Sequence, residues 1–380
     1  MPDGAFPQAL LQQPSHARIA YFHSFTMAHP RLKEADMALR QAIQDPAGLS
    51  LIFVYGPTGV GKTTLRLRVE KYLKQSLLST LQEDPGRIPV VSVEAAADAA
   101  QFSWKDYYRR ALVAMEEPLI DQKISYRVRG VYRDGAGRFT LDPRAVGLEL
   151  RYALESALLY RRPVAFFIDE AQHLTKMKSG RKLQDQLDSI KSLANLTKTI
   201  HIMFGTYELL PFRNLSAQLS RRSIDIHFPR YRADRPEDYV AFQSVLFTFQ
   251  RHLPLPGESD LLKHFDYCYE RSIGCVGVLK DWLIRALAIA LAEDSPAITR
   301  KILEQTAWSV CQCQRMAKDA LEGEADLTES EEDRGKLRQL LCLEPTTFAA
   351  LDNRARNSRV GQRRPFRDAV GVSHGVLHAS

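Results

Sequence analysis

Cysteine is scarce in this sequence, with five residues in 380, and the five form no recognisable metal motif. None belongs to a CxxC pair, and Cys311 and Cys313 have no matching second pair. His264 lies near Cys268 and Cys275, so a zinc site is an alternative, but reduced thiols in or near helices fit this spacing better. The cysteines therefore favour a reducing compartment, and we expect a cytoplasmic protein.

Long hydrophobic runs are also missing. The most apolar helical stretch, Trp282 to Glu293, is interrupted by Arg285 and falls short of the roughly 20 residues of a membrane span. The N-terminal sequence MPDGAFPQALLQQPSHARIA has no basic segment before an apolar run, so we do not expect a signal peptide. We predict no association with a membrane.

No strong excess of either charge is present. The formal net charge of +7 is mildly basic, which is compatible with nucleic acid but does not establish it. The hydrophobic content of 45% and the charged content of 26% are typical of a globular protein with a sizeable core.

Short apolar runs predict an α/β half followed by a helical half. Strands are expected at residues 51–55, 88–93, 164–168, 200–204 and 224–228, and helices at 63–78, 102–115 and 146–159. A hairpin is expected within residues 123–141, around the turn sequence DGAG. From Pro236 to about Cys342 the pattern is helical, with no further strand.

These patterns predict four segments. We expect a flexible leader at 1–17, an α/β nucleotide-binding subdomain at 18–235, a helical lid with further helices at 236–345, and a disordered basic tail at 346–380. The tail contains Arg354, Arg356, Arg359, Arg363, Arg364 and Arg367, which are either a docking or DNA-contacting segment or a solvated tail.

The sequence GPTGVGKT matches the phosphate-binding loop G-x-x-x-x-G-K-[ST] and lies between an apolar strand and a helix, as that motif requires. Its glycines let backbone N–H groups surround phosphate oxygens at the positive end of a helix. Lys62 can reach the β- and γ-phosphates of ATP, and the Thr63 hydroxyl can bind Mg²⁺. The predicted nucleotide-binding residues are Gly56, Pro57, Thr58, Gly59, Val60, Gly61, Lys62, Thr63 and Thr64.

A second apolar strand ends in two acids, in the sequence FFIDEAQHL. Asp169 is placed to hold Mg²⁺, directly or through water, and Glu170 to orient and deprotonate the attacking water. The sequence DEAQH is one residue longer than the DEAH box of helicases. Because a second helicase core with its strands is also missing after Pro236, we discard the helicase interpretation.

Two further features lie at strand ends. Thr206 follows the strand IHIMF and could touch the γ-phosphate or the attacking water, although it could simply end the strand. Arg221 and Arg222 precede the last short strand, where one could reach a neighbouring subunit's nucleotide, or both could be a solvated pair. This order predicts an α/β P-loop AAA+ core with a parallel five-stranded sheet, a helical lid and a flexible basic tail.

The stretches YGPTGVGKTTL, FFIDEAQHL, FGTYEL, QLSRR and AYFHSFTMAHPRLKEA together resemble the TnsC/TniB-type AAA+ ATPases, regulators of DNA transposition that include CRISPR-associated members. The resemblance covers roughly residues 18–292. It implies an ATPase that forms a homo-oligomer on double-stranded DNA and links a target-selecting protein to the transposase.

The resemblance also implies roles for single residues. Lys62 with the other loop residues would hold ATP, Asp169 would be the metal acid and Glu170 the water-activating acid. Thr206 would be the first sensor, and Arg221 or Arg222 the finger supplied to a neighbour. The stretch SIGCVGVLKDWL resembles the family's turn into a lid helix, but it leaves open whether Lys280 or Arg271 acts as a second sensor.

DNA contacts would come from basic residues between the two nucleotide-binding strands, unless these only form a solvated face. They are Lys105, Lys123, Arg127, Arg129 and Arg133. Contacts to the phosphate backbone predict binding with little sequence preference. The alternative functions are a replication initiator or clamp-loader-like ATPase, and a signalling NTPase that does not bind DNA.

Overall fold

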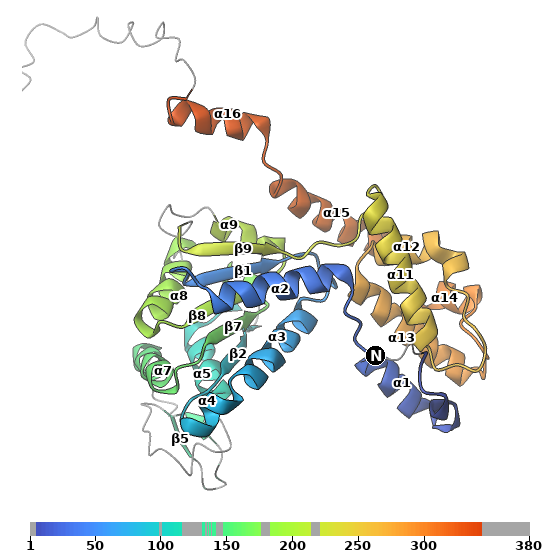
Figure 1. The fold of residues 1–380 in the computed structure, drawn as a ribbon, viewed down its shortest axis with the longest axis horizontal. Helices are drawn as coiled ribbons and strands as arrows, with labels where there is room; N and C mark the ends of the chain where they lie inside the picture. Colours follow the sequence, from blue (N-terminus) through green and yellow to red (C-terminus); the bar gives the residue numbers. More distant parts are fainter. Residues whose placement is uncertain are drawn as a thin grey trace, which may run out of the picture. The chain divides into compact units, whose positions relative to one another are not determined.

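The computed structural model describes residues 5–98, 101–115, 131–133, 135, 137, 139–141, 147–175, 183–213 and 221–343. The chain divides into two units, Met1–Leu327 and Thr328–Ser380. The described part of the second unit contains the helix α16 (Glu331–Leu340), and the predicted nucleotide motifs all lie in the first unit (Figure 1).

A parallel five-stranded sheet forms the centre of the first unit. Its strands are β1 (Leu51–Tyr55), β2 (Val90–Glu94), β7 (Ala165–Asp169), β8 (Ile200–Gly205) and β9 (Ser223–His227), and their order is β2-β7-β8-β1-β9. Tyr55 at the end of β1 is in register with Gly205 and His227, and Glu94 is in register with Asp169. The carboxyl ends of the strands therefore share one edge of the sheet, and the five predicted strands are confirmed.

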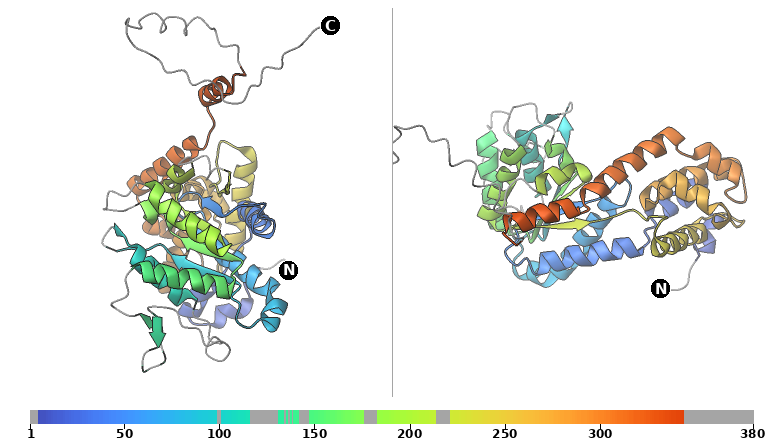
Figure 2. Two further views of the ribbon diagram at one scale, coloured as in Figure 1. Left: turned by 90° about the vertical axis from the view of Figure 1, so that its left-hand side faces the viewer. Right: turned by 90° about the horizontal axis from the view of Figure 1, so that it is seen from above.

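The strands β1, β7 and β8 are buried along their whole length because helices cover both faces of the sheet (Figure 2). One face packs against α2 (Pro30–Gln44) and α3 (Lys62–Ser76), and the other against α5 (Trp104–Ala114), α7 (Gly147–Arg161) and α8 (Leu183–Thr197). Successive strand residues alternate between the two cores, so Phe166 packs on one face and Phe167 on the other. This alternation explains why the strands read as continuous apolar runs.

Helices follow β9, as predicted. They are α11 (Pro236–His252), α12 (Phe265–Ser272), α13 (Val276–Ala292), α14 (Arg300–Thr306) and α15 (Val310–Asp326), with the short η4 (Leu262–His264). Helices α11 to α14 enclose a separate core that includes Trp282 and Phe249, whereas α15 packs in a smaller cluster through Cys313. Helix α1 (Ser15–Ser24) adds Phe22 to the larger core, so this helical lobe combines an early helix with helices that follow the sheet.

The N-terminal segment, predicted as a leader, includes a short helix and a hydrogen bond to the helical lobe. Gln8–Gln12 form the 3-10 helix η1, and the backbone N–H of Phe6 donates to the carbonyl of Arg251 (3.1 Å). This hydrogen bond to α11 holds the N-terminal segment on the helical lobe.

Several short elements complete the first unit. They are α4 (Leu78–Glu83), η2 (Ala171–Thr175), η3 (Tyr207–Leu209), α9 (Leu210–Arg213), and the antiparallel pairs β3 (Ala97–Asp98) with β4 (Gln101–Phe102) and β5 (Val131–Arg133) with β6 (Phe139–Leu141). The β5–β6 pair is the predicted hairpin, whereas β3 and β4 are too short to leave a sequence pattern. Within the described ranges, no helix has the length and apolarity needed to cross a membrane.

Candidate functional site

The predicted phosphate-binding loop connects β1 to the N-terminus of α3. Gly59 and Gly61 have φ angles of 75° and 111°, in the left-handed region that favours glycine. At Gly56 a Cβ atom would lie 2.1 Å from the carbonyl oxygen of Phe228, so only glycine fits there. The motif therefore folds as predicted, and the positive end of α3 faces the loop.

Lys62 supplies a cation inside this loop. Its ammonium donates to the carbonyls of Gly56 (3.0 Å) and Pro57 (2.9 Å), and the residue is only 9% exposed. Burial lowers the pKa of Lys62 to about 8, although the negative charges of Glu170 and Asp169 partly offset this effect. A desolvated ammonium held by two carbonyls is well suited to bind an anionic phosphate.

Asp169 lies beside the first turn of α3. The Thr63 hydroxyl donates to Asp169 Oδ2 (3.3 Å), so the structure brings together the two predicted metal-binding residues. Arg66, which the sequence analysis missed, also donates to Oδ2 through Nε (2.9 Å). The hydroxyl and carboxylate oxygens suit Mg²⁺, because this ion prefers oxygen ligands and few protein groups.

Glu170 directly follows β7 and adopts a left-handed backbone conformation, with φ of 51°. Its N–H donates to Asp169 Oδ1 (3.1 Å). Its carboxylate accepts a hydrogen bond from the side-chain amide of Gln172 (2.6 Å). The turn thus places both acids at the end of β7, beside the phosphate-binding loop.

Thr206 follows β8, the strand next to β7. Its N–H donates to Gln172 Oε1 (3.3 Å), and its hydroxyl oxygen is buried without a hydrogen-bond partner among the described residues. Thr206 lines a pocket of about 480 Å³ together with Pro57 and Thr58 of the phosphate-binding loop. A buried, unpaired hydroxyl at this place is available to a bound group, as expected for a sensor.

The N-terminus of α13 contacts the same loop. The N–H groups of Gly277 (2.7 Å) and Val278 (3.3 Å) donate to the carbonyl of Gly59. A Cβ atom at Gly277 would lie 2.4 Å from that oxygen, so a glycine is required for the approach. The first turn of α13 therefore packs directly against the phosphate-binding loop.

A second, mainly apolar pocket lies where the N-terminal segment, the loop and α13 meet. Its lining includes Phe25, Met27, Val60, Gly61 and Val276. Aromatic and aliphatic side chains beside a phosphate-binding loop are suited to a flat nucleobase.

The two candidates for a second sensor lie differently. Lys280 lines the apolar pocket, and its ammonium donates to the carbonyl of His23 (2.7 Å). Arg271 instead donates to the carbonyl of Trp308 (3.2 Å) and stacks on Tyr267. Of the two, only Lys280 lies near the phosphate-binding loop.

Arg221 and Arg222 lie at the start of β9, at the opposite edge of the sheet from the phosphate-binding loop. The carbonyl of Arg222 accepts from the N–H of Ser50, which precedes β1, and its guanidinium donates to Asn195 (3.4 Å). The structure therefore does not bring either arginine to the nucleotide site of its own chain. That position is compatible with a role toward a neighbouring chain.

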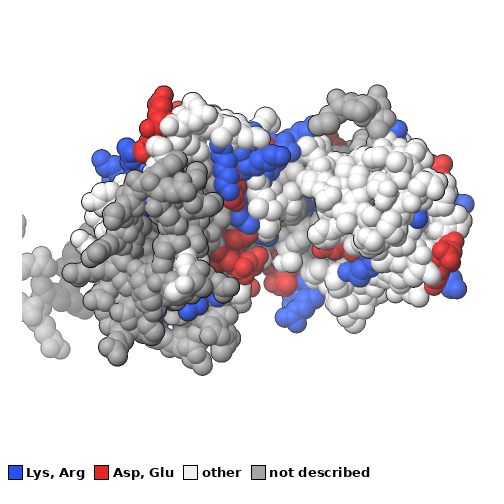
Figure 3. Space-filling view, turned by 90° about the horizontal axis from the view of Figure 1, so that it is seen from below, with Lys and Arg blue, Asp and Glu red and all other residues white. Residues whose placement is uncertain are grey.

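The predicted DNA contacts are only partly described. Lys105 is exposed on α5, and Arg133 ends the strand β5. Lys123, Arg127 and Arg129, like the arginines of the C-terminal tail, lie outside the described residues. On the face drawn in Figure 3, basic and acidic side chains are interspersed between the two lobes, and most of the helical lobe is uncharged.

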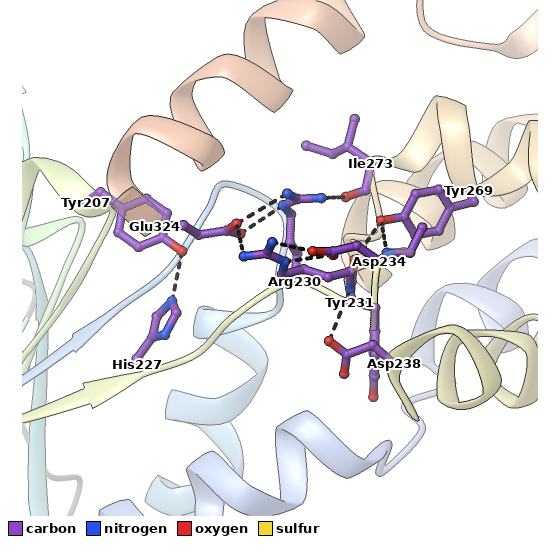
Figure 4. Close-up of polar contacts among 11 residues, drawn as sticks. Tyr207, His227, Arg230, Tyr231, Asp234, Asp238, Tyr269, Ile273 and Glu324 are labelled. Atoms are coloured by element: carbon purple, nitrogen blue, oxygen red, sulfur yellow. Dashed lines mark hydrogen bonds and ion pairs between the residues drawn. The ribbon is translucent and has the colours of Figure 1, made fainter. Parts of the chain in front are cut away.

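A polar network links α15 to the ends of two strands (Figure 4). Arg230, in the segment after β9, forms a bidentate ion pair with Glu324 of α15 (2.9 and 3.2 Å) and donates to the carbonyl of Ile273 (3.3 Å). The hydroxyl of Tyr207 lies 2.9 Å from His227 Nε2. Burial lowers the pKa of His227 to about 4, so the imidazole is neutral at pH 7.

No cluster of three or more His, Cys, Asp or Glu side chains able to hold a metal ion occurs in the described ranges. Cys268 and Cys275 are buried free thiols, and burial raises the pKa of each to about 12. Cys313 is also buried, whereas Cys311 and Cys342 are exposed.

Comparison with known proteins finds a family match within the α/β part of the chain. Residues 47–212 match the family described as AAA domain. No curated protein matches the chain. The chain is similar to the Walker-type ATPase PABY2304 of Pyrococcus abyssi, with 17% identity, a TM-score of 0.42, and coverage of 82% of this chain and 75% of that one.

Two further solved structures resemble the chain. The ORC2 protein of Aeropyrum pernix, in ADPNP-ADP complexes, has 14% identity and a TM-score of 0.45, with coverage of 76% of this chain and 72% of that one. The ORC1 protein of the same organism, in complex with DNA, has 17% identity and a TM-score of 0.47, with coverage of 77% and 68%.

Proposed function

We propose that the chain, which has a P-loop AAA+ fold and matches an AAA domain at residues 47–212, is an ATPase that regulates DNA transposition. The ATPase activity is supported by three groups that lie together at the carboxyl ends of the strands. These are the buried ammonium of Lys62, the Thr63–Asp169 hydroxyl–carboxylate pair, and the Glu170 carboxylate.

Each of these groups has a distinct task. Lys62 and the loop N–H groups bind the β- and γ-phosphates, and Thr63 with Asp169 would hold Mg²⁺. When bound by these two residues, Mg²⁺ would supply positive charge against the phosphates. Glu170 orients the attacking water and takes up its proton, while Thr206 contacts the γ-phosphate or that water.

The finger of the proposed enzyme comes from a neighbouring copy. Arg221 and Arg222 lie at the far edge of the sheet from their own chain's phosphate-binding loop, so either can act only on another chain's nucleotide. In related P-loop systems such an arginine contributes on the order of 10³-fold or more to the rate. Hydrolysis is then coupled to assembly into a homo-oligomer.

The transposition role rests on the resemblance of the motifs to TnsC/TniB-type ATPases. In this proposal the oligomer binds double-stranded DNA through its backbone and connects a target-selecting protein to the transposase. A replication initiator would usually carry a winged-helix domain after the lid. Within the continuously described residues 221–343 the elements after His227 are helices.

Purified protein with Lys62→Ala and Glu170→Gln variants tests the ATPase. Lys62→Ala should lose ATP-dependent assembly on DNA, because the phosphates lose their cationic partner. Glu170→Gln should bind ATP, hydrolyse it very slowly and remain on DNA longer than the wild type. Normal turnover by Glu170→Gln would mean that another group activates the water.

DNA binding separates the proposal from a DNA-independent NTPase. With ATP present, affinity for duplex DNA should fall steeply as salt rises and should depend little on sequence. An absence of nucleotide-dependent DNA binding would favour the signalling NTPase.

Mixed oligomers test the finger. An Arg221→Ala or Arg222→Ala variant that loses hydrolysis should regain part of it when mixed with Lys62→Ala. The Lys62→Ala subunit still has both arginines and can place one at the intact phosphate-binding loop of the arginine variant. Co-assembly of the two variants must be measured first. If both arginine variants hydrolyse ATP normally alone, neither residue is the finger.

A further inference from the structure

Gln172 connects the proposed base to the proposed sensor through one buried side chain. Its amide nitrogen donates to Glu170 Oε2 (2.6 Å), and its amide oxygen accepts the N–H of Thr206 (3.3 Å). The residue is 6% exposed and lies in η2, directly after β7. One amide thereby spans the ends of the neighbouring strands β7 and β8.

The surrounding backbone is shaped for this amide. The left-handed conformation of Glu170 turns the chain so that the side chains of residues 170 and 172 meet. Gly205 leaves the space for the amide oxygen, because a Cβ atom there would lie 2.6 Å from Gln172 Oε1. A glutamine suits this place because it offers a donor and an acceptor on one planar group, and both are used.

We infer that Gln172 is a positioning residue for hydrolysis, acting through Glu170. The inference rests on the proposed function, in which Glu170 activates the water. The hydrogen bond to Oε2 fixes the orientation of the carboxylate and leaves Oε1 to accept a proton from water. The hydrogen bond between Gln172 and the N–H of Thr206 fixes the distance between the Glu170 carboxylate and Thr206, the proposed sensor of the γ-phosphate.

This role has a consequence that a purely structural role lacks. A structural amide would stabilise the fold, and its loss would affect binding and hydrolysis alike. A positioning amide affects the hydrolytic step, because a base misplaced by about 1 Å can cost on the order of 100-fold in rate. Binding of ATP should be spared, since the side-chain hydrogen bonds of Gln172 among the described residues go to Glu170 and Thr206 and not to the phosphate-binding loop.

The test compares Gln172→Met and Gln172→Glu in the full-length chain. Methionine keeps the length of the side chain but makes neither hydrogen bond. Glutamate keeps the acceptor for Thr206 and places a second carboxylate against Glu170. We expect Gln172→Met to lower the single-turnover hydrolysis rate about 10- to 100-fold, and Gln172→Glu to lower it further. The Kd for ATP should change less than about threefold.

Gln186→Met is the matched control. Gln186 is also buried, but its amide oxygen accepts from the Trp104 indole (2.7 Å), between α8 and α5. Its substitution should leave the hydrolysis rate unchanged. Thermal unfolding and circular dichroism of each variant identify any that fails to fold, in which case the other Gln172 variant decides.

A double-variant cycle shows whether Gln172 acts through Glu170. Adding Gln172→Met to Glu170→Gln should cause no further loss, whereas independent effects would multiply. Wild-type hydrolysis by Gln172→Met, or a milder defect in Gln172→Glu than in Gln172→Met, would overturn the inference. If instead Glu170→Gln hydrolyses ATP normally, the role proposed for Glu170 fails, and with it the premise of this inference.

Discussion

Arg66 and Thr63 donate to the same carboxylate oxygen of Asp169, from consecutive turns of α3. The guanidinium also pairs with Glu70 (3.1 Å), so it joins two acids on one side of the helix. Asp169 is the acid proposed to hold Mg²⁺. A fixed positive charge on this oxygen therefore competes with the metal for the same carboxylate.

The first prediction follows from this competition. Arg66→Gln should lower the Mg²⁺ concentration for half-maximal ATP hydrolysis roughly three- to tenfold, because Asp169 no longer shares its charge with a guanidinium. A Mg²⁺ titration of the hydrolysis rate measures this. Arg68→Gln is the control, since Arg68 lies on the same helix but pairs with Asp36. An unchanged or higher Mg²⁺ requirement in Arg66→Gln would contradict the prediction.

The second prediction concerns proton uptake on ATP binding. Burial lowers the pKa of Lys62 to about 8, so the free protein loses this charge as the pH rises above 8. Bound phosphate favours the ammonium, so ATP binding at pH 9 should take up a proton, and affinity should fall by up to about tenfold per pH unit above 8.

Calorimetry at pH 9 in two buffers of different ionisation enthalpy measures this uptake. The apparent binding enthalpies should differ for the wild type. Lys62→Met should bind more weakly and show no difference between buffers. Equal heats for the wild type would mean that Lys62 stays charged in the free protein.

The third prediction concerns the contact between α13 and the phosphate-binding loop. In Gly277→Ala the added methyl group would lie 2.4 Å from the carbonyl oxygen of Gly59, so α13 or the loop must shift. We expect the Kd for ATP to rise about tenfold, equivalent to about 1.4 kcal/mol. Gly335→Ala serves as the control, because nothing lies within 4 Å of its added methyl group. Equal affinities for both variants would show that the contact is not needed for binding.

The fourth prediction concerns the buried ion pair of Arg230 with Glu324, whose side chains are 10% and 9% exposed. Glu324→Met leaves Arg230 as a buried charge without its carboxylate, so it should lower the free energy of unfolding by about 3–5 kcal/mol. Arg230→Met should lower it less, because Arg232 Nη1 also lies 3.7 Å from Glu324 Oε2. The double variant should lose much less than the sum of the two.

Urea denaturation of the four proteins measures this coupling. Lys318→Met is the control on the same helix, because its pair with Glu322 is exposed and should contribute less than about 1 kcal/mol. Additive losses at Arg230 and Glu324 would show that the two charges do not stabilise each other.

Much of the fold could be predicted from local patterns. Apolar runs bounded by turn residues mark all five strands of the sheet, and the spacing of Gly56, Gly61 and Lys62 marks the phosphate-binding loop. The acids after β7 were also predictable, because their position at a strand end follows from the sequence alone.

Contacts between distant residues left no such signal. Arg66 and Asp169 are 103 positions apart, and Arg230 and Glu324 are 94 apart, so only the folded topology brings them together. Gln172 was visible in FFIDEAQHL, but its contact with Glu170 depends on a left-handed turn that a glutamate seldom adopts. The order of the strands, and the place of α1 in the helical lobe, were equally beyond local patterns.

Phe22 of α1 completes the helical lobe only after α13 has been synthesised, because its core partners include Trp282 and Leu283. During synthesis, the apolar face of α1 therefore stays exposed to solvent until the α/β sheet and the following helices have left the ribosome. Such long-range closure slows folding and leaves hydrophobic surface open to association meanwhile. The same topology places α1 in one core with α14, so detachment of α1 would expose that core.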